Sequence, residues 1–236
     1  MLKSSKTHSI LGWISFIAIS VGLYMAFIYA PVAVNPSTGK AFISQKIFYF
    51  HVASAWNAFL AFFVVFIASI GYLKNRNPKW DIVAKVSAEI GVVFTTIVLA
   101  TGPIWARAAW NRWWDWEPRL TTTMILWFIY LAYVLIRSSS LEGEKKATMA
   151  AVFGIIGFLD VPIVFFAIKW WGSRYHPVVL EGAGGGGLAP TMLQALIVSV
   201  IAFTFLYFYL LQKGIYVEHT AEKVKKIKEK LRAKTH

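Results

Sequence analysis

The sequence predicts an all-α, polytopic membrane protein, built as a bundle of six transmembrane helices. Composition is the first observation, because 58% of the 236 residues are hydrophobic and only 15% are charged, which is too apolar for a soluble domain of this length. The second observation is that the apolar residues fall into six runs, each long enough to cross a bilayer as a helix. The chain also has no cysteine, which excludes structural disulfides, thiolate metal sites and thiol redox chemistry.

The first apolar run covers residues 10–30. It is too long for the core of a signal peptide and has no convincing small-residue cleavage site, so we expect it to be the first transmembrane helix. A loop at 31–46 follows, and Asn35-Pro36 and Gly39 within it interrupt any regular structure.

The second and third runs are expected to form two helices joined by a polar turn. Residues 47–73 make a run longer than a bilayer needs, so one end of this helix should stand in the headgroup region. The turn at 74–81 contains three basic residues and a proline. The third helix is then expected at about 82–106.

The last three runs predict three further helices. The fourth is expected at about 120–136, because Pro118 favours an extended residue before it and a helix soon after it. The fifth is expected at 147–171 and the sixth at 191–211, with a loop at 172–190 between them. The chain should therefore cross the membrane six times.

The distribution of basic residues predicts the orientation. Seventeen of the 24 Lys and Arg lie in the termini and in the connections after the second and fourth helices, and cytoplasmic segments carry such an excess. Both termini are therefore expected in the cytoplasm, with the loops at 31–46, 107–119 and 172–190 on the outer face. Residues 1–212 would be one transmembrane domain and 213–236 a basic cytoplasmic tail near anionic lipid. We expect the net charge of +13 to reflect this tail and not a nucleic-acid partner.

One stretch, WARAAWNRWWDWEPRLT at 105–121, is far richer in tryptophan than the rest of the chain. Its five tryptophans are Trp105, Trp110, Trp113, Trp114 and Trp116. An aromatic belt at the membrane interface accounts for one or two tryptophans per helix end, but not for five together. Asp115 and Glu117 are expected to pair with neighbouring arginines such as Arg119. An aromatic plate with cations beside it suits a flat, anionic ligand.

Two of the five histidines, His51 and His176, are expected at the outer boundary on separate segments. A lone histidine on an apolar helix is more often a hydrogen-bonded core residue than a ligand, because imidazole can donate, accept or titrate. Near His51, however, small residues lie on the same helix face and leave space beside the ring. These are Ser54, Ala55 and Ala58.

Haem would use all of these features. Iron takes two imidazoles as axial ligands, a porphyrin needs apolar and aromatic walls, and the propionates need cations. The candidate cations are Arg107, Arg112, Arg119, Lys169 and Arg174. Sites for quinones and lipid-linked sugars also use tryptophan and arginine, but binding these ligands would not require two histidines.

The sequence also resembles a known family. The motif WWDWEPRLT at 113–121 resembles the tryptophan-rich signature of the haem-handling proteins of cytochrome c biogenesis. FHVASAW at 50–56, and VPIVFFAIKWW at 161–171 followed by His176, look like the two histidine regions of the CcmC family, the small six-span proteins of the System I cytochrome c maturation machinery. The resemblance covers nearly the whole chain, and its length fits this family better than the larger CcmF and CcsA proteins.

Three positions depart from the pattern of the family. Glu117 stands where the family usually has Asp, and Ala53 replaces a common proline. Phe165 replaces a histidine that is often found in the fifth helix, which implies that this position is not needed for iron.

The resemblance implies that the chain binds haem b at the outer face of the cytoplasmic membrane and transfers it to the haem chaperone CcmE. His51 and His176 would be the axial ligands. The other haem-binding residues would be Trp105, Trp110, Trp113, Trp114, Asp115, Trp116 and Arg119. The tryptophan-rich segment would present the haem edge to CcmE, and the transporter CcmAB and the small CcmD would be further partners.

These expectations describe a binding and transfer protein better than a classical enzyme. Two alternatives remain: a transporter that conducts haem through its own bundle, and a haem lyase related to CcmF and CcsA. The first would need polar residues in the middle of the membrane, where Asp160 is the main example.

We expect Asp160 to solvate the backbone that Pro162 frees, or to pair with a cation. Glu89 is expected to pair with Lys85 on the same helix.

Overall fold

The computed structural model describes residues 5–34, 39, 41–140, 143–173 and 188–233. Six helices in these ranges are long and apolar enough to cross a membrane. They are α1 (Ser5–Tyr24), α2 (Ile47–Asn75), α3 (Pro78–Trp110), α4 (Pro118–Ser138), α5 (Gly143–Trp171) and α6 (Pro190–Arg232). The predicted fold class, a bundle of six transmembrane helices, is confirmed.

The first span, predicted at 10–30, ends in a π-helical turn η1 (Met25–Tyr29) that follows α1. The segment predicted as a loop at 31–46 contains short regular elements: an antiparallel pair of strands, β1 (Ala33–Val34) and β2 (Ala41–Phe42), and a 3₁₀ turn η2 (Ile43–Lys46). Lys46 is buried, and its ammonium group donates a hydrogen bond to the carbonyl oxygen of Ala30. A cation is favourable at the carbonyl end of a helix, so Lys46 joins the end of the first span to the beginning of the second.

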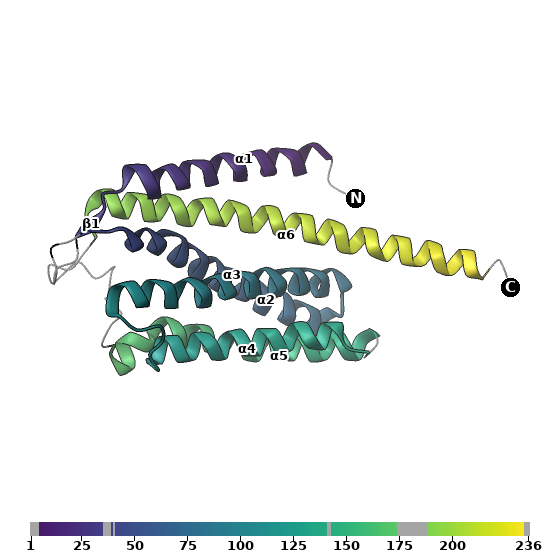
Figure 1. Ribbon diagram of the computed structural model, residues 1–236. Helices are drawn as coiled ribbons and strands as arrows, with labels where there is room; N and C mark the ends of the chain where they lie inside the picture. The colour runs from purple at the N-terminus through teal and green to yellow at the C-terminus, as the bar shows by residue number, and fades with distance from the viewer. Residues whose placement is uncertain (1–4, 35–38, 40, 141–142, 174–187, 234–236) are drawn as a thin grey trace.

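The helices are arranged in pairs (Figure 1). α1 packs along α6, α4 packs along α5, and α2 contacts α3, α5 and α6. The two chain ends lie at the same end of the bundle, and the short elements before α2 lie at the opposite end. An even number of spans requires this arrangement of the termini.

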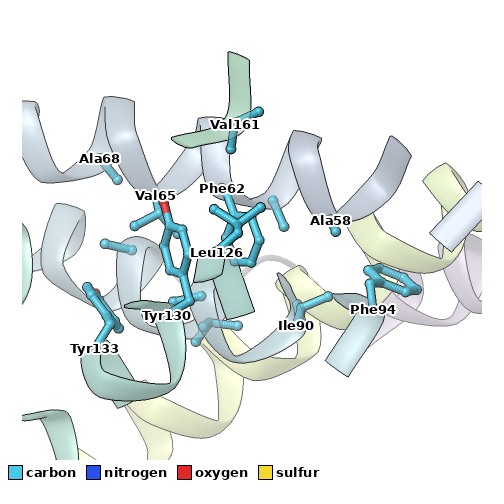
Figure 2. Close-up of a cluster of buried hydrophobic side chains, with 14 of the residues drawn as sticks. Ala58, Phe62, Val65, Ala68, Ile90, Phe94, Leu126, Tyr130, Tyr133 and Val161 are labelled. Atoms are coloured by element: carbon cyan, nitrogen blue, oxygen red, sulfur yellow. The ribbon is translucent and has the colours of Figure 1, made fainter. Parts of the chain in front are cut away.

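The core of the bundle is centred on aromatic side chains from α2 and α4 (Figure 2). The rings of Phe62 and Tyr130 are stacked, with their centroids 3.6 Å apart. The Tyr130 hydroxyl donates to the carbonyl oxygen of Gly154 on α5, at 3.1 Å. Lipid is as apolar as the core, so helices in a membrane associate through such close packing and interhelical hydrogen bonds.

Two helices extend four or more residues beyond their predicted ends. α3 ends at Trp110, not at residue 106, and α6 ends at Arg232, not at residue 211. Residues 213–232, predicted as a tail separate from the sixth helix, continue that helix. The predicted ends marked where hydropathy falls, but Lys, Glu, Ala and Leu after that point all favour helix.

Two predicted interactions of charged residues differ from those in the structure. Lys85 donates a hydrogen bond to Glu218 at 2.7 Å, where the prediction paired it with Glu89. The extension of α6 brings Glu218 to this position. The Oδ2 atom of Asp160 is buried and has no hydrogen-bond partner among the residues that the structure describes, so neither expected role of Asp160 is seen at this atom.

Candidate functional site

A cavity of about 470 Å³ lies between the helices, within the range of roughly 300–1,000 Å³ that is typical of cofactor and ligand sites. Its walls come from the beginnings of α2, α4 and α6 and from the ends of α3 and α5. All of these helix ends belong to the end of the bundle opposite the two termini. The walls are mostly apolar and aromatic, and His51, Arg119 and Lys169 are their ionisable residues.

His51 lies one turn from the beginning of α2 and forms part of the cavity wall. Its Nδ1 atom is 2.9 Å from the hydroxyl oxygen of Thr101 on α3. Ala55 and Ala58 also line the cavity, which confirms that small residues on this helix face leave space beside the imidazole. Ser54, the third small residue, is fully buried and is not part of the wall.

The loop predicted at 107–119 is shorter in the structure, because α3 extends to Trp110. Asn111 ends this helix in a left-handed conformation (φ 60°), and its backbone N–H bonds to the carbonyl oxygen of Arg107 at 3.2 Å. Asn is one of the few residues that adopt this conformation readily at a helix end. Pro118 then occupies the first turn of α4, where its missing N–H costs nothing. Residues 111–117 connect the two helices.

The five tryptophans fall into two groups. Trp105, Trp110 and Trp114 line the cavity, whereas the side chains of Trp113 and Trp116 are 60% and 70% exposed. The ring of Trp105 lies edge-on to that of Trp110, with centroids 4.9 Å apart. The indole nitrogens of Trp105 and Trp114 are buried and have no hydrogen-bond partner among the described residues.

The predicted cations also fall into two groups, those that line the cavity and those that do not. Arg119 and Lys169 line the cavity, and Arg119 donates to the carbonyl oxygen of Phe165 at 2.9 Å. Arg107 bonds to Asn111 and lies 6.0 Å from the centroid of the Trp113 ring. Arg112 and Arg107 are not part of the wall, so the expectation that they face the ligand is not met by the described structure.

The two acidic residues of the segment have different partners. Asp115 lies 3.9 Å from Arg112, which confirms the predicted pairing with a neighbouring arginine. Glu117 is buried, with 7% exposure, and accepts hydrogen bonds from the hydroxyl of Ser173 at 2.9 and 3.0 Å. Glu117 therefore connects the beginning of α4 to the segment that follows α5.

Several residues of the site were not predicted. Thr101, Gly102 and Ser173 have no signature of their own in the sequence, because their contacts form only when α3 meets α2 and when α4 meets the end of α5. Phe165, noted only as a replacement for histidine, lines the cavity, and its ring lies edge-on to Trp56 with centroids 5.9 Å apart. His176 and Arg174, both predicted at the site, lie outside the residues that the structure describes.

Comparison with known proteins gives a consistent result. The family described as CcmC, heme exporter protein C, matches residues 1–230. A heme exporter protein C of Bradyrhizobium diazoefficiens is 33% identical over 204 residues, which are 85% of this chain and 75% of the relative. The protein of that name in Rhodobacter capsulatus is 28% identical, over 89% of this chain and 86% of the relative.

A mitochondrial relative matches over a shorter range. It is a putative cytochrome c biosynthesis ccmC-like protein of Marchantia polymorpha, 32% identical over 157 residues, which are 66% of each chain. Because the family match extends over almost the whole sequence and the fold has the six spans expected from the resemblance, this chain belongs to the heme exporter protein C (CcmC) family.

Proposed function

We propose that the chain binds haem in the cavity beside His51 and hands it on during cytochrome c maturation. The observation that carries this proposal is the composition of the cavity wall. One imidazole, four indoles and two cations line a space of about 470 Å³, and the chain belongs to a family whose members are named heme exporter protein C.

The residues fit haem in three respects. Trp105, Trp110 and Trp114 supply flat apolar surface for a porphyrin. Arg119 and Lys169 supply positive charge at the wall, which suits propionate groups. The buried indole N–H groups of Trp105 and Trp114 would gain an acceptor if carboxylates entered the cavity, since a buried donor without a partner is costly.

The chain would hold the iron through two histidines. When bound, haem supplies an iron centre that accepts an axial imidazole on each face of the porphyrin. His51 would be one axial ligand, and His176, which follows the last residue of α5 by five positions, the other. Since the chain has no cysteine, the haem would be held without a covalent bond, as haem b.

Handing haem on would take place at one membrane face. The cavity lies at one end of the bundle, which favours binding at that face over passage of haem through the bundle. Trp113 and Trp116 are exposed beside it, and exposed aromatic residues are common anchors of protein contacts. We assign this surface to the chaperone CcmE, on the outer face of the cytoplasmic membrane, with CcmAB and CcmD as further partners.

The test is an absorption spectrum of the detergent-purified protein, with haem measured per chain. We expect low-spin haem in the wild type, because two imidazoles give a strong field. His51→Ala and His176→Ala should lose haem or convert it to the high-spin form. His8→Ala and His219→Ala are the matched controls and should keep the wild-type spectrum. Unchanged spectra in both His51→Ala and His176→Ala would reject the ligand assignment.

A further inference from the structure

We infer that Thr101 is a positioning residue that holds His51 in the tautomer required for binding iron through Nε2. This inference rests on the proposed function, because it describes how the chain prepares one axial ligand. It concerns the contact between Thr101 on α3 and His51 on α2, of which His51 lines the cavity.

The direction of the hydrogen bond between the two side chains follows from the other partner of Thr101. The Thr101 hydroxyl lies 2.7 Å from the carbonyl oxygen of Ile97, and a carbonyl can only accept. The single hydroxyl proton therefore points to Ile97. The lone pairs of the same oxygen face Nδ1 of His51 at 2.9 Å, so Nδ1 carries the proton and donates.

The opposite tautomer is less favourable here. If Nε2 carried the proton, Nδ1 would be an acceptor, and Thr101 would have to turn its hydroxyl away from Ile97 to donate to it. In that arrangement the Thr101 hydroxyl would give up its hydrogen bond to the carbonyl oxygen of Ile97. Nδ1–H is thus favoured, and the lone pair that can coordinate a metal is on Nε2.

Gly102 fixes the ring from a second direction. A methyl group at this position would lie 3.3 Å from Cε1 of His51 and 4.0 Å from Nδ1. The Nδ1–Cε1 edge of the imidazole therefore lies close against α3, and a side chain at position 102 would press against it. Two consecutive residues of α3, Thr101 and Gly102, therefore lie against the same edge of the ring.

This contact should affect the iron electronically as well as geometrically. A histidine that donates from its second nitrogen is a more basic ligand, and loss of such a partner typically weakens metal binding about 10–100-fold. A more basic imidazole favours ferric over ferrous iron. Removing the Thr101 hydroxyl should therefore weaken haem binding and raise the reduction potential of the haem that remains bound.

The chain contains a matched control on the same helix. The hydroxyl of Thr96 donates to the carbonyl oxygen of Val92 at 2.8 Å and accepts from the ring nitrogen of Trp127 at 2.9 Å. It makes the same two kinds of hydrogen bond as Thr101, but its side-chain partner is Trp127 and not His51. A general effect of removing a threonine hydroxyl from α3 should appear equally in Thr96→Val.

The experiment uses the full-length protein in detergent and compares Thr101→Val, Thr101→Ser, Thr96→Val and His51→Ala. Haem affinity, the visible spectrum and the midpoint potential are measured for each. We expect Thr101→Val to bind haem about 10–100-fold more weakly and to show a more positive potential. Thr101→Ser should restore both properties, and Thr96→Val should match the wild type. If Thr101→Val does not fold, Thr101→Ala removes the same hydroxyl without adding volume and carries the same expectation.

Different outcomes would reject the role of Thr101 and the role of His51 as a ligand. A wild-type potential and affinity in Thr101→Val, an equal shift in Thr96→Val, or no recovery in Thr101→Ser would each overturn the role of Thr101. A wild-type spectrum in His51→Ala would instead overturn the proposed ligand itself, whatever the threonine variants show.

Discussion

The tryptophans between α3 and α4 differ in their surroundings, and this difference separates two functions at the scale of single residues. Trp114 lines the cavity, and its indole nitrogen is buried. Trp116 lies edge-on to Trp114, with ring centroids 5.8 Å apart, but 70% of its surface is exposed. Under the proposed function, Trp114 would contact the porphyrin and Trp116 would contact the chaperone.

A pair of substitutions tests this division. Trp114→Ala removes a wall of the cavity and should weaken haem binding by about tenfold or more, since truncating a buried aromatic anchor costs on the order of 2 kcal/mol. Trp116→Ala should change haem binding less than about twofold, because an exposed ring contributes little to an enclosed site. It should nevertheless reduce the haem attached to CcmE. Bound haem and chaperone-attached haem are measured in the same preparations.

Trp113→Ala serves as a second exposed variant. Its ring is 60% exposed and lies near Arg107, so it should behave like Trp116→Ala in haem binding. If Trp116→Ala loses haem in proportion to transfer, the segment acts only as a wall, and the assigned docking surface is wrong.

Sequence reasoning identified the five tryptophans as a group but could not separate them. The division depends on α3 extending to Trp110 and on the left-handed turn at Asn111, neither of which changes the hydropathy of the segment. Thr101 was missed for a related reason. Its role comes from His51 on another helix, and a threonine in an apolar run has no spacing that indicates such a partner.

At the scale of secondary structure, α3 is the helix that joins the core to the site. Its middle packs closely on α2 at Gly91, where a methyl group would lie 2.4 Å from Cε1 of Phe62. The ring of Phe62 is fully buried and stacked on Tyr130 within the core cluster (Figure 2), so moving it would disturb that packing. The C-terminal part of α3 carries Thr101 and Trp105. The distance between α2 and α3 in the core therefore also determines how His51 meets Thr101.

Gly91→Ala should therefore destabilise the protein. Overpacking a close-packed core typically costs about 1–3 kcal/mol, so the unfolding temperature in detergent should fall by several degrees. Gly22→Ala is the control, because its methyl group would lie at an ordinary contact distance of 3.4 Å from Cβ of Ala202. Thermal unfolding followed by size-exclusion chromatography measures both variants. Equal unfolding temperatures for the two would show that α2 and α3 can separate at this point.

The helices themselves were predictable, whereas several of their ends were not. Each apolar run corresponds to one of the six helices, since a bilayer requires about twenty apolar residues per span. Ends depend on local capping: α3 begins at Pro78 because the Asn77 side chain accepts the N–H of Lys79 at 3.0 Å. Hydropathy marks the membrane boundary, and a helix such as α6 continues past that boundary where its residues still favour helix.

At the scale of the whole molecule, the two ends of the bundle differ in chemistry. The ion pairs between helices, Asp81–Arg137 at 2.5 Å and Lys85–Glu218 at 2.7 Å, lie at the end that carries both termini. The cavity and the tryptophan-rich segment at 105–121 lie at the other end. In the sequence, seventeen of the 24 Lys and Arg fall in the segments that were expected on the side of the termini. Because cytoplasmic segments carry the excess of Lys and Arg, this asymmetry supports an orientation in which the cavity faces outward.

The absence of natural cysteines makes this orientation directly testable. Arg112 and Lys79 are both exposed and lie at opposite ends of α3, one just after the helix and the other in its first turn. In intact cells or spheroplasts, Arg112→Cys should react with a membrane-impermeant maleimide, because the tryptophan-rich segment is expected outside. Lys79→Cys should react only after the membrane is permeabilised, and this second labelling shows that the thiol itself is accessible. Labelling of Lys79→Cys alone before permeabilisation would place the cavity on the cytoplasmic side, and haem could then not be handed to a partner on the outer face.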